Sequence, residues 1–115
     1  MIKYPLINKI LFVSIGAIPA AILRWQIDNT FVVNIIACFL IGYINSTKID
    51  ARLKLILGFG FCGSLSTFSG WIFDLFKLIS NGLLLDFLIN LLLTLIISFL
   101  AIYLGSLFAG KITKL

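Results

Sequence analysis

The sequence predicts an all-α membrane protein with four transmembrane helices, the third of which is broken near its middle. Of the 115 residues, 62% are hydrophobic and only 11% are charged, and the mean hydropathy is +1.21. A soluble domain of this length needs far more polar surface. The apolar residues fall into four stretches, and roughly 20 such residues span a bilayer as a helix. Residues 58–71, inside the third stretch, hold four glycines and four hydroxyl residues in fourteen positions.

The four spans are expected at about residues 6–23, 31–45, 53–79 and 83–108. The polar segments between them are short, so we expect residues 1–115 to form a single four-helix transmembrane domain. The first stretch has the hydropathy of a secretory signal, but no small-residue cleavage motif and soluble domain follow it. We therefore expect it to be a membrane helix.

The third stretch has the length of a membrane helix and residues that disrupt one. Its glycines are accompanied by hydroxyl side chains between Ser64 and Ser69, and both residue types favour irregular backbone. In lipid, freed backbone groups are tolerated only where protein buries them or where they line a cavity or an ion site. This segment is therefore where we expect the function.

The basic residues are distributed unevenly between the two sides of a four-span chain. One side holds seven of them and the opposite side only Arg24 and Lys77. By the positive-inside rule both termini are expected in the cytoplasm. These charges then act as topology determinants and lipid headgroup contacts, and no nucleic-acid partner is expected. The seven are Lys3, Lys9, Lys48, Arg52, Lys54, Lys111 and Lys114.

Polar side chains recur at helical spacing within the second and fourth spans. Thr30 and Asn34 are four residues apart and therefore share one helix face. With the hydroxyl groups of the third span they can line a narrow polar track. The alternative is ordinary interhelical hydrogen bonding, worth about 1 kcal/mol per contact, and Asn45 and Asn90 can also face headgroups. The remaining members of the track are Ser64, Ser66, Thr67, Ser69, Asn90, Thr94 and Ser98.

Two aromatic residues, Phe68 and Trp71, lie three positions apart beside these hydroxyl groups. Because the edge of an aromatic ring is electropositive, ring edges can line an anion path without a fixed charge, although plain packing is the alternative. General acid–base and nucleophilic catalysis need a tuned titratable group or an activated nucleophile, and neither constellation is present. The sequence therefore predicts a protein that is not an enzyme. With no histidine and two separate cysteines, it predicts no transition-metal site.

Three segments of the chain resemble motifs of the Fluc/CrcB fluoride channels. Residues 60–71, GFCGSLSTFSGW, are similar to the family pattern G-F-C-G-G-x-T-T-F-S-T-F. Residues 30–42, TFVVNIIACFLIG, resemble T-x-x-V-N-x-x-G-S-F-x-x-G, and residues 16–25, GAIPAAILRW, are close to G-G-x-x-G-A-x-x-R-Y. Residues 101–105 match the end of the fourth helix. The resemblance covers nearly the whole chain in order.

The resemblance implies a passive, fluoride-specific channel in the cell (inner or plasma) membrane that exports fluoride from the cytoplasm and confers fluoride resistance. Family members are antiparallel dimers of four-helix subunits with two narrow pores. Asn34 takes the place of the pore asparagine, and Phe68 and Trp71 take the places of the two pore phenylalanines. The other pore positions are Thr30, Thr67, Ser69, Asn90 and Thr94.

The resemblance also implies a structural Na⁺ at the dimer centre, held by the backbone carbonyls of Gly63 and Ser66, with Arg24 closing the first helix. Hard cations prefer oxygen ligands, which suits carbonyls freed by a break. The chain departs from the family pattern inside this region and at two helix glycines. The departures are Ser64, Ser66, Gly70, Trp71, Ala20 and Ala37.

The charge bias predicts a single membrane orientation, so we expect a heterodimer with a related, oppositely oriented subunit, with a homodimer as the alternative. A small multidrug-type proton-coupled transporter is a competing function, but residues 6–23 lack the carboxylate that it needs. A non-conducting partner of a pore-forming subunit is a third possibility, which Gly70 and Trp71 favour.

Overall fold

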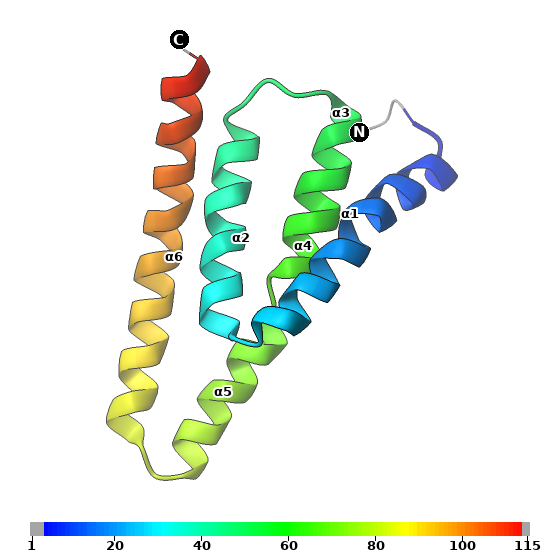
Figure 1. Cartoon of the computed structure of the whole chain (residues 1–115). Helices are drawn as coiled ribbons and strands as arrows, with labels where there is room; N and C mark the ends of the chain where they lie inside the picture. The colour runs from blue at the N-terminus through cyan, green and yellow to red at the C-terminus, as the bar shows by residue number, and fades with distance from the viewer. Residues whose placement is uncertain (1–3, 114–115) are drawn as a thin grey trace.

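The chain folds into helices joined by short turns in a computed structural model that describes residues 4–113, with side chains described as far as Gly110. No strand occurs within that range. Four helical segments follow one another, and the third is made of several pieces (Figure 1). They are α1 (Leu6–Ile27), α2 (Thr30–Asn45), the succession α3 (Ala51–Leu53), η1 (Lys54–Cys62), α4 (Gly63–Leu65) and α5 (Phe68–Ser80), and finally α6 (Leu84–Thr113).

Three of the segments are long and apolar enough to cross a bilayer, namely Leu6–Ile27, Ala51–Ser80 and Leu84–Gly110. The second, Thr30–Asn45, is apolar but shorter, with 16 residues. α1 continues past the expected end of the first span, so Arg24 lies in its last turn, where a cation suits the negative end of the helix dipole. Asp28 then ends α1 in the left-handed conformation, with φ 49°.

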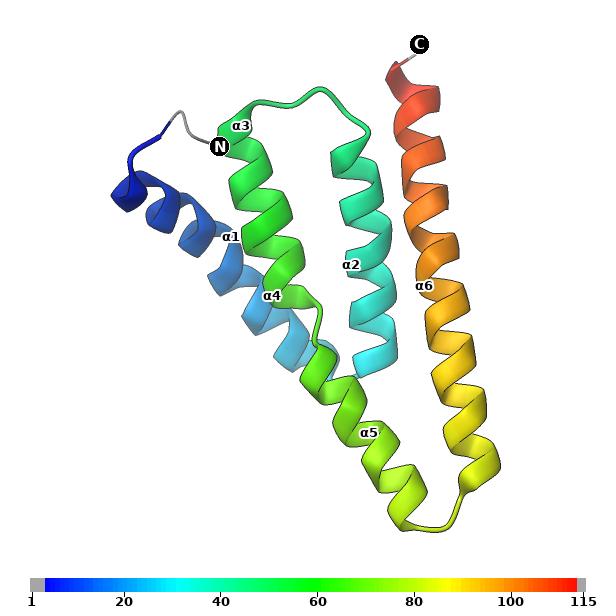
Figure 2. The same cartoon turned by 180° about the vertical axis from the view of Figure 1, so that it is seen from behind.

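Both chain ends and the connection from α2 to α3 lie at one end of the molecule, whereas the α5–α6 turn lies at the other (Figures 1 and 2). α5 and the start of α6 extend beyond the turn that joins α1 to α2. The α2–η1 region brings Lys48, Arg52 and Lys54 to the end that holds the termini. Three basic residues of the same predicted side lie outside the described side chains: Lys3, Lys111 and Lys114.

Glycines allow two pairs of helices to approach closely. α1 crosses η1 at Gly16 and Gly60, and α2 crosses α6 at Gly42 and Gly105. A Cβ atom at any of these positions would overlap a backbone carbonyl of the opposite helix. Small residues at such crossings are the usual basis of helix packing in membranes. The carbonyls concerned are those of Ile56, Val13, Ile102 and Phe39, in the same order.

The buried core is small and lies beside the interruption of the third segment. Ala20, Val33, Ala37 and Leu65 are each at most 3% exposed. Most large apolar side chains instead lie on the outside, and Phe99, for example, is 71% exposed. An apolar exterior of this kind suits contact with lipid rather than water.

The third segment is irregular over two stretches. η1 has the wide i→i+5 bonding of a π-helix, which is rare in proteins. Ser66 and Thr67 then leave the helical conformation, with ψ 153° at Ser66 and φ −146°, ψ 111° at Thr67. α5 starts again at Phe68. The irregular backbone lies inside the glycine- and hydroxyl-rich stretch 58–71.

Candidate functional site

Asn34 hydrogen-bonds to the backbone at the interruption. Its Oδ1 accepts a hydrogen bond of 2.7 Å from the Thr67 N–H, and its Nδ2 donates one of 3.1 Å to the Thr67 carbonyl. In an uninterrupted helix the Thr67 N–H would bond to the Gly63 carbonyl. The Asn34 amide has therefore taken the place of the helical partner of the Thr67 N–H.

The side chain of Thr67 begins α5. Its Oγ1 accepts a hydrogen bond of 3.1 Å from the Gly70 N–H, and it lies 3.3 Å from the Ser69 Oγ. This is an ordinary N-cap. A Cβ on Gly70 would lie 3.0 Å from the Thr67 methyl carbon and 3.3 Å from the Thr30 hydroxyl oxygen. Gly70, where the family pattern has threonine, therefore lies where a larger side chain would crowd Thr30 and Thr67.

Beside the interruption lies a hollow of about 220 Å³, which we call the central hollow. Its lining contains amide, hydroxyl, thiol, aromatic and aliphatic groups and no charged side chain. The rings of Phe68 and Trp71 meet edge to face, with centroids 5.9 Å apart at 67°, and Phe68 is 72% exposed on this single chain. The lining residues are Asn34, Cys38, Ser66, Thr67, Phe68, Trp71, Thr94, Leu95 and Ser98.

A second hollow of about 250 Å³, the arginine hollow, adjoins the central hollow at Thr67. Arg24, Asp28 and Thr30 line it. It lies at the turn between α1 and α2 and carries both a positive and a negative group. The arginine hollow therefore carries charged groups, whereas the lining of the central hollow has none.

The indole of Trp71 links α5 to α6. Its Nε1 donates a hydrogen bond of 2.9 Å to Asn90 Oδ1, which also accepts one of 3.3 Å from the Thr94 hydroxyl. Asn90 and Thr94 line a third hollow of about 370 Å³ together with Asp86, and we call it the Asn90 hollow. Thr94 borders both this hollow and the central one.

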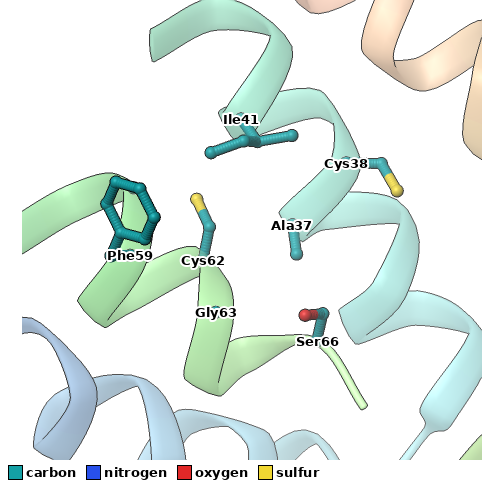
Figure 3. A pocket seen from close by; sticks show the side chains of 8 residues that line it. Ala37, Cys38, Ile41, Phe59, Cys62, Gly63 and Ser66 are labelled. Carbon is teal, nitrogen blue, oxygen red and sulfur yellow. The ribbon is translucent and has the colours of Figure 1, made fainter. Parts of the chain in front are cut away.

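Gly63 and Ser66, the expected cation ligands, line a fourth hollow of about 250 Å³ between α2 and the third segment (Figure 3). Cys62 and Ile41 lie on facing sides of it. Its lining has no carboxylate, and within the described residues no group of three His, Cys, Asp or Glu side chains can hold a metal ion. The Ser66 hydroxyl is the side-chain oxygen in this lining.

The expected pore residues divide among these hollows. Asn34, Thr67, Phe68, Trp71 and Thr94 meet around the central hollow. Thr30 and Arg24 line the arginine hollow, and Asn90 lies in the third. Ser69 contacts Thr67 and does not line any of them.

The other residues that line the central hollow are Ser66 and Ser98, which belong to the expected polar track, and Cys38 and Leu95, which do not. Ser98 is four positions after Thr94, and this helical spacing is the one that placed it in the track. Cys38 follows Asn34 by four and shares its face for the same reason. The bond from Trp71 to Asn90 has no such local signal, because the two residues are on different helices.

Comparison with known proteins places the chain in a family. Residues 11–106 match the family described as CrcB-like protein, Camphor Resistance (CrcB). The chain is 46% identical over 105 residues to "Fluoride-specific ion channel FluC 1" of Prochlorococcus marinus (strain NATL2A), covering 91% of this chain and 92% of that protein. It is 32% identical over 122 residues to "Fluoride-specific ion channel FluC" of Methanococcus aeolicus, covering 93% and 99%.

A shorter match reaches a protein with a different number in its name. "Fluoride-specific ion channel FluC 2" of Prochlorococcus marinus (strain MIT 9313) is 41% identical over 75 residues, which cover 65% of this chain and 60% of that protein. The family match extends from the first helix to the last, so it includes every element that lines the hollows. The resemblance in the sequence motifs is thereby confirmed, and the chain belongs to the CrcB-like family.

Proposed function

We propose that this protein is a subunit of a fluoride-specific channel, which exports fluoride passively from the cytoplasm through narrow pores of an antiparallel dimer. One observation carries the proposal: the central hollow lies at interrupted backbone and is lined by hydrogen-bond donors and ring edges without a charged group. The names of the family relatives, fluoride-specific ion channels, support the choice of ion.

The chemistry of the lining suits a small anion that is strongly hydrated. Fluoride accepts hydrogen bonds, so it can exchange its water for the donors of Asn34 and the hydroxyl of Thr67 stepwise, while Phe68 presents a ring edge. Thr30, Ser69 and Asn90 extend this set of donors on either side, and Thr94 lines the path beside Asn90. Because the central hollow holds no carboxylate or histidine, permeation needs no coupled proton. The protein is a channel and not an enzyme.

The dimer is supported by what a single chain leaves uncovered. Phe68, a proposed pore residue, is 72% exposed, and the central hollow is not enclosed by the single chain. A pore for a dehydrated ion must exclude water and lipid all round. A second subunit packed against this face would close the hollow and complete each of the two pores.

We propose a structural Na⁺ at the centre of that dimer, with the carbonyls of Gly63 and Ser66 as ligands. Both residues line the same hollow, and the Thr67 N–H that would otherwise bond to the Gly63 carbonyl is given to Asn34. Two carbonyls from each of two subunits would supply four oxygens to a hard cation. When bound, the ion holds the two interrupted segments together, with Arg24 closing α1 beside them.

The second subunit is proposed to be a related chain of opposite orientation. Basic residues gather at the end of the molecule that holds both termini, and we place this end in the cytoplasm. A chain with so strong a bias inserts one way, so an antiparallel partner must carry the opposite bias. Relatives named FluC 1 and FluC 2 support a pair of related subunits, although a homodimer is the alternative.

Fluoride release from liposomes tests the proposal against its two rivals. Liposomes containing this chain, alone or with the related subunit, are loaded with potassium fluoride and release is followed with a fluoride electrode. A channel releases fluoride when valinomycin carries K⁺ out, with or without a pH gradient. A proton-coupled transporter needs the gradient. If this chain is only a non-conducting partner, replacing it in the pair with a variant of the same chain whose pore residues are mutated leaves the rate of fluoride release unchanged.

A further inference from the structure

We infer that Trp71 is a positioning residue for anion selectivity and flux: its indole N–H fixes the orientation of Asn90, so that the Asn90 amide presents its NH₂ group to the permeating anion. The inference rests on the proposed channel function and deepens it. Trp71 occupies a position where the family pattern has phenylalanine, which has no N–H. The role is therefore specific to chains with an indole here.

The direction of the Asn90 amide follows from its partners. The indole Nε1–H only donates, so the atom 2.9 Å from it must be the amide oxygen of Asn90. The oxygen and nitrogen of an amide are assigned from such networks. Thr94 then has to donate its hydroxyl hydrogen to the same oxygen, at 3.3 Å. With phenylalanine at position 71, only Thr94 would remain as a partner of the Asn90 amide. Because a hydroxyl can accept from the NH₂ group as well as donate to the oxygen, the amide could then turn over.

The donors available to an anion follow from this arrangement. Thr94 is only 6% exposed and uses its single O–H on Asn90, so it cannot also donate to an ion. The Asn90 NH₂ group has no hydrogen-bond partner among the described residues. No fully buried side-chain N or O atom in that part of the chain lacks a partner, so this NH₂ reaches accessible space. Asn90 lines the hollow that it shares with Asp86 and Thr94.

An oriented NH₂ matters at this place because a carboxylate is nearby. The Asn90 hollow also contains Asp86, whose charge disfavours an anion, and Thr94 connects this hollow with the central one. An amide turned the other way would present its oxygen, a second electronegative group, to the ion. By orienting the amide, Trp71 therefore sets whether Asn90 presents a hydrogen-bond donor or an electronegative oxygen to fluoride beside Asp86.

The test is a double-mutant cycle on fluoride flux, measured on whichever assembly conducts, this chain alone or with the related subunit. Trp71→Phe keeps an aromatic ring against Phe68 and removes the N–H. We expect fluoride release to fall about fivefold, which is what the net contribution of one hydrogen bond amounts to. In an Asn90→Ala background, Trp71→Phe is expected to cause no further loss, because its effect passes through Asn90.

A closer isostere of tryptophan serves as the control for loss of packing or folding in the Trp71→Phe variant. 3-Benzothienylalanine at position 71 replaces only the indole N–H by sulfur, so packing and size are kept, and it should reproduce the loss seen with Trp71→Phe. Unchanged release with either replacement, or an equal loss in the presence and absence of Asn90, would overturn the inference and leave the channel function intact. A wild-type assembly that releases no fluoride contradicts the proposed function itself.

A spectroscopic reading tests the geometry independently of conduction. The chain has two tryptophans, so the Trp25→Phe protein reports on Trp71 alone. Because a hydrogen-bonded indole emits at longer wavelength than a free one, Asn90→Ala should shift this emission to the blue. Asn90→Asp retains an acceptor oxygen and should not shift it to the blue. Identical spectra for the parent and Asn90→Ala would show that Trp71 and Asn90 are not bonded.

Discussion

Asn34 stands out at the scale of single residues, because it serves the backbone as well as the proposed pore. Its amide makes bonds of 2.7 and 3.1 Å to the N–H and the carbonyl of Thr67. An amide has two N–H donors, so one remains for an anion while the other holds the interruption. Asn34 therefore both faces the proposed ion path and holds the backbone of Thr67 at the interruption.

Replacing Asn34 is expected to destabilise the protein and abolish fluoride release together. Asn34→Ala removes two hydrogen bonds and leaves the Thr67 N–H and carbonyl unpaired, which should lower the free energy of unfolding by about 2–4 kcal/mol. Unfolding in mixed micelles measures it. Asn45→Ala is the control, because Asn45 is exposed at the end of α2, and its cost should stay within about 0.5 kcal/mol. Equal stability of the two variants would contradict this role of Asn34.

The glycine crossings are the main determinants at the scale of helices. Gly42 and Gly105 let the backbones of α2 and α6 come into contact, as Gly16 and Gly60 do for α1 and η1. The first crossing fixes α2, which carries Asn34, against α6, which carries Asn90 and Thr94. The second fixes α1 against the π-helical part that leads to the interruption. The positions of the proposed pore groups therefore depend on residues that never touch the ion.

Two alanine substitutions on α6 separate close contact from helix propensity. Gly105→Ala would place a methyl group on the Phe39 carbonyl and should cost about 1–3 kcal/mol of stability. Gly110→Ala meets nothing within 4 Å and should be neutral or stabilising by up to about 1 kcal/mol, since alanine is the better helix former. The melting temperatures of the two variants decide this. A destabilised Gly110→Ala with an unaffected Gly105→Ala would contradict the crossing.

The sequence predicted most of the helices, but few of the hydrogen bonds between residues on different helices. Apolar length indicated the helices, and the glycine–hydroxyl run indicated irregular backbone where Ser66 and Thr67 now have extended torsions. The partner of Thr67 lies 33 residues away, and no local pattern gives such a contact. The sequence pattern also did not predict the π-helical hydrogen bonding of η1.

At the scale of the whole molecule, the apolar exterior favours insertion into a membrane, and the distribution of basic residues sets the orientation. The termini and the α2–α3 connection lie together at one end, and the chain carries seven basic residues on that predicted side against two on the other. Charge bias of this size sets the direction of insertion. A single direction is compatible with an antiparallel dimer only when the partner is another chain.

Topology mapping tests this expectation. A reporter fused to the C-terminus should be found only in the cytoplasm when this chain is expressed alone. Replacing Lys48, Arg52 and Lys54 with glutamine should produce a mixed population, because the bias then falls from seven against two to four against two. Equal populations of cytoplasmic and external C-termini for the unaltered chain would instead indicate a homodimer.

The central claim is that fluoride passes through the central hollow, and labelling a residue in its wall tests this most directly. Ser98 lines the hollow, whereas the adjacent Phe99 is 71% exposed on the outside of α6. Each is changed to cysteine in a Cys38→Ala, Cys62→Ala protein and labelled to completion with a small methanethiosulfonate, as checked by mass. We predict that the label stops fluoride release from liposomes at position 98 and leaves it unchanged at position 99. Full release after complete labelling of position 98 would contradict the account.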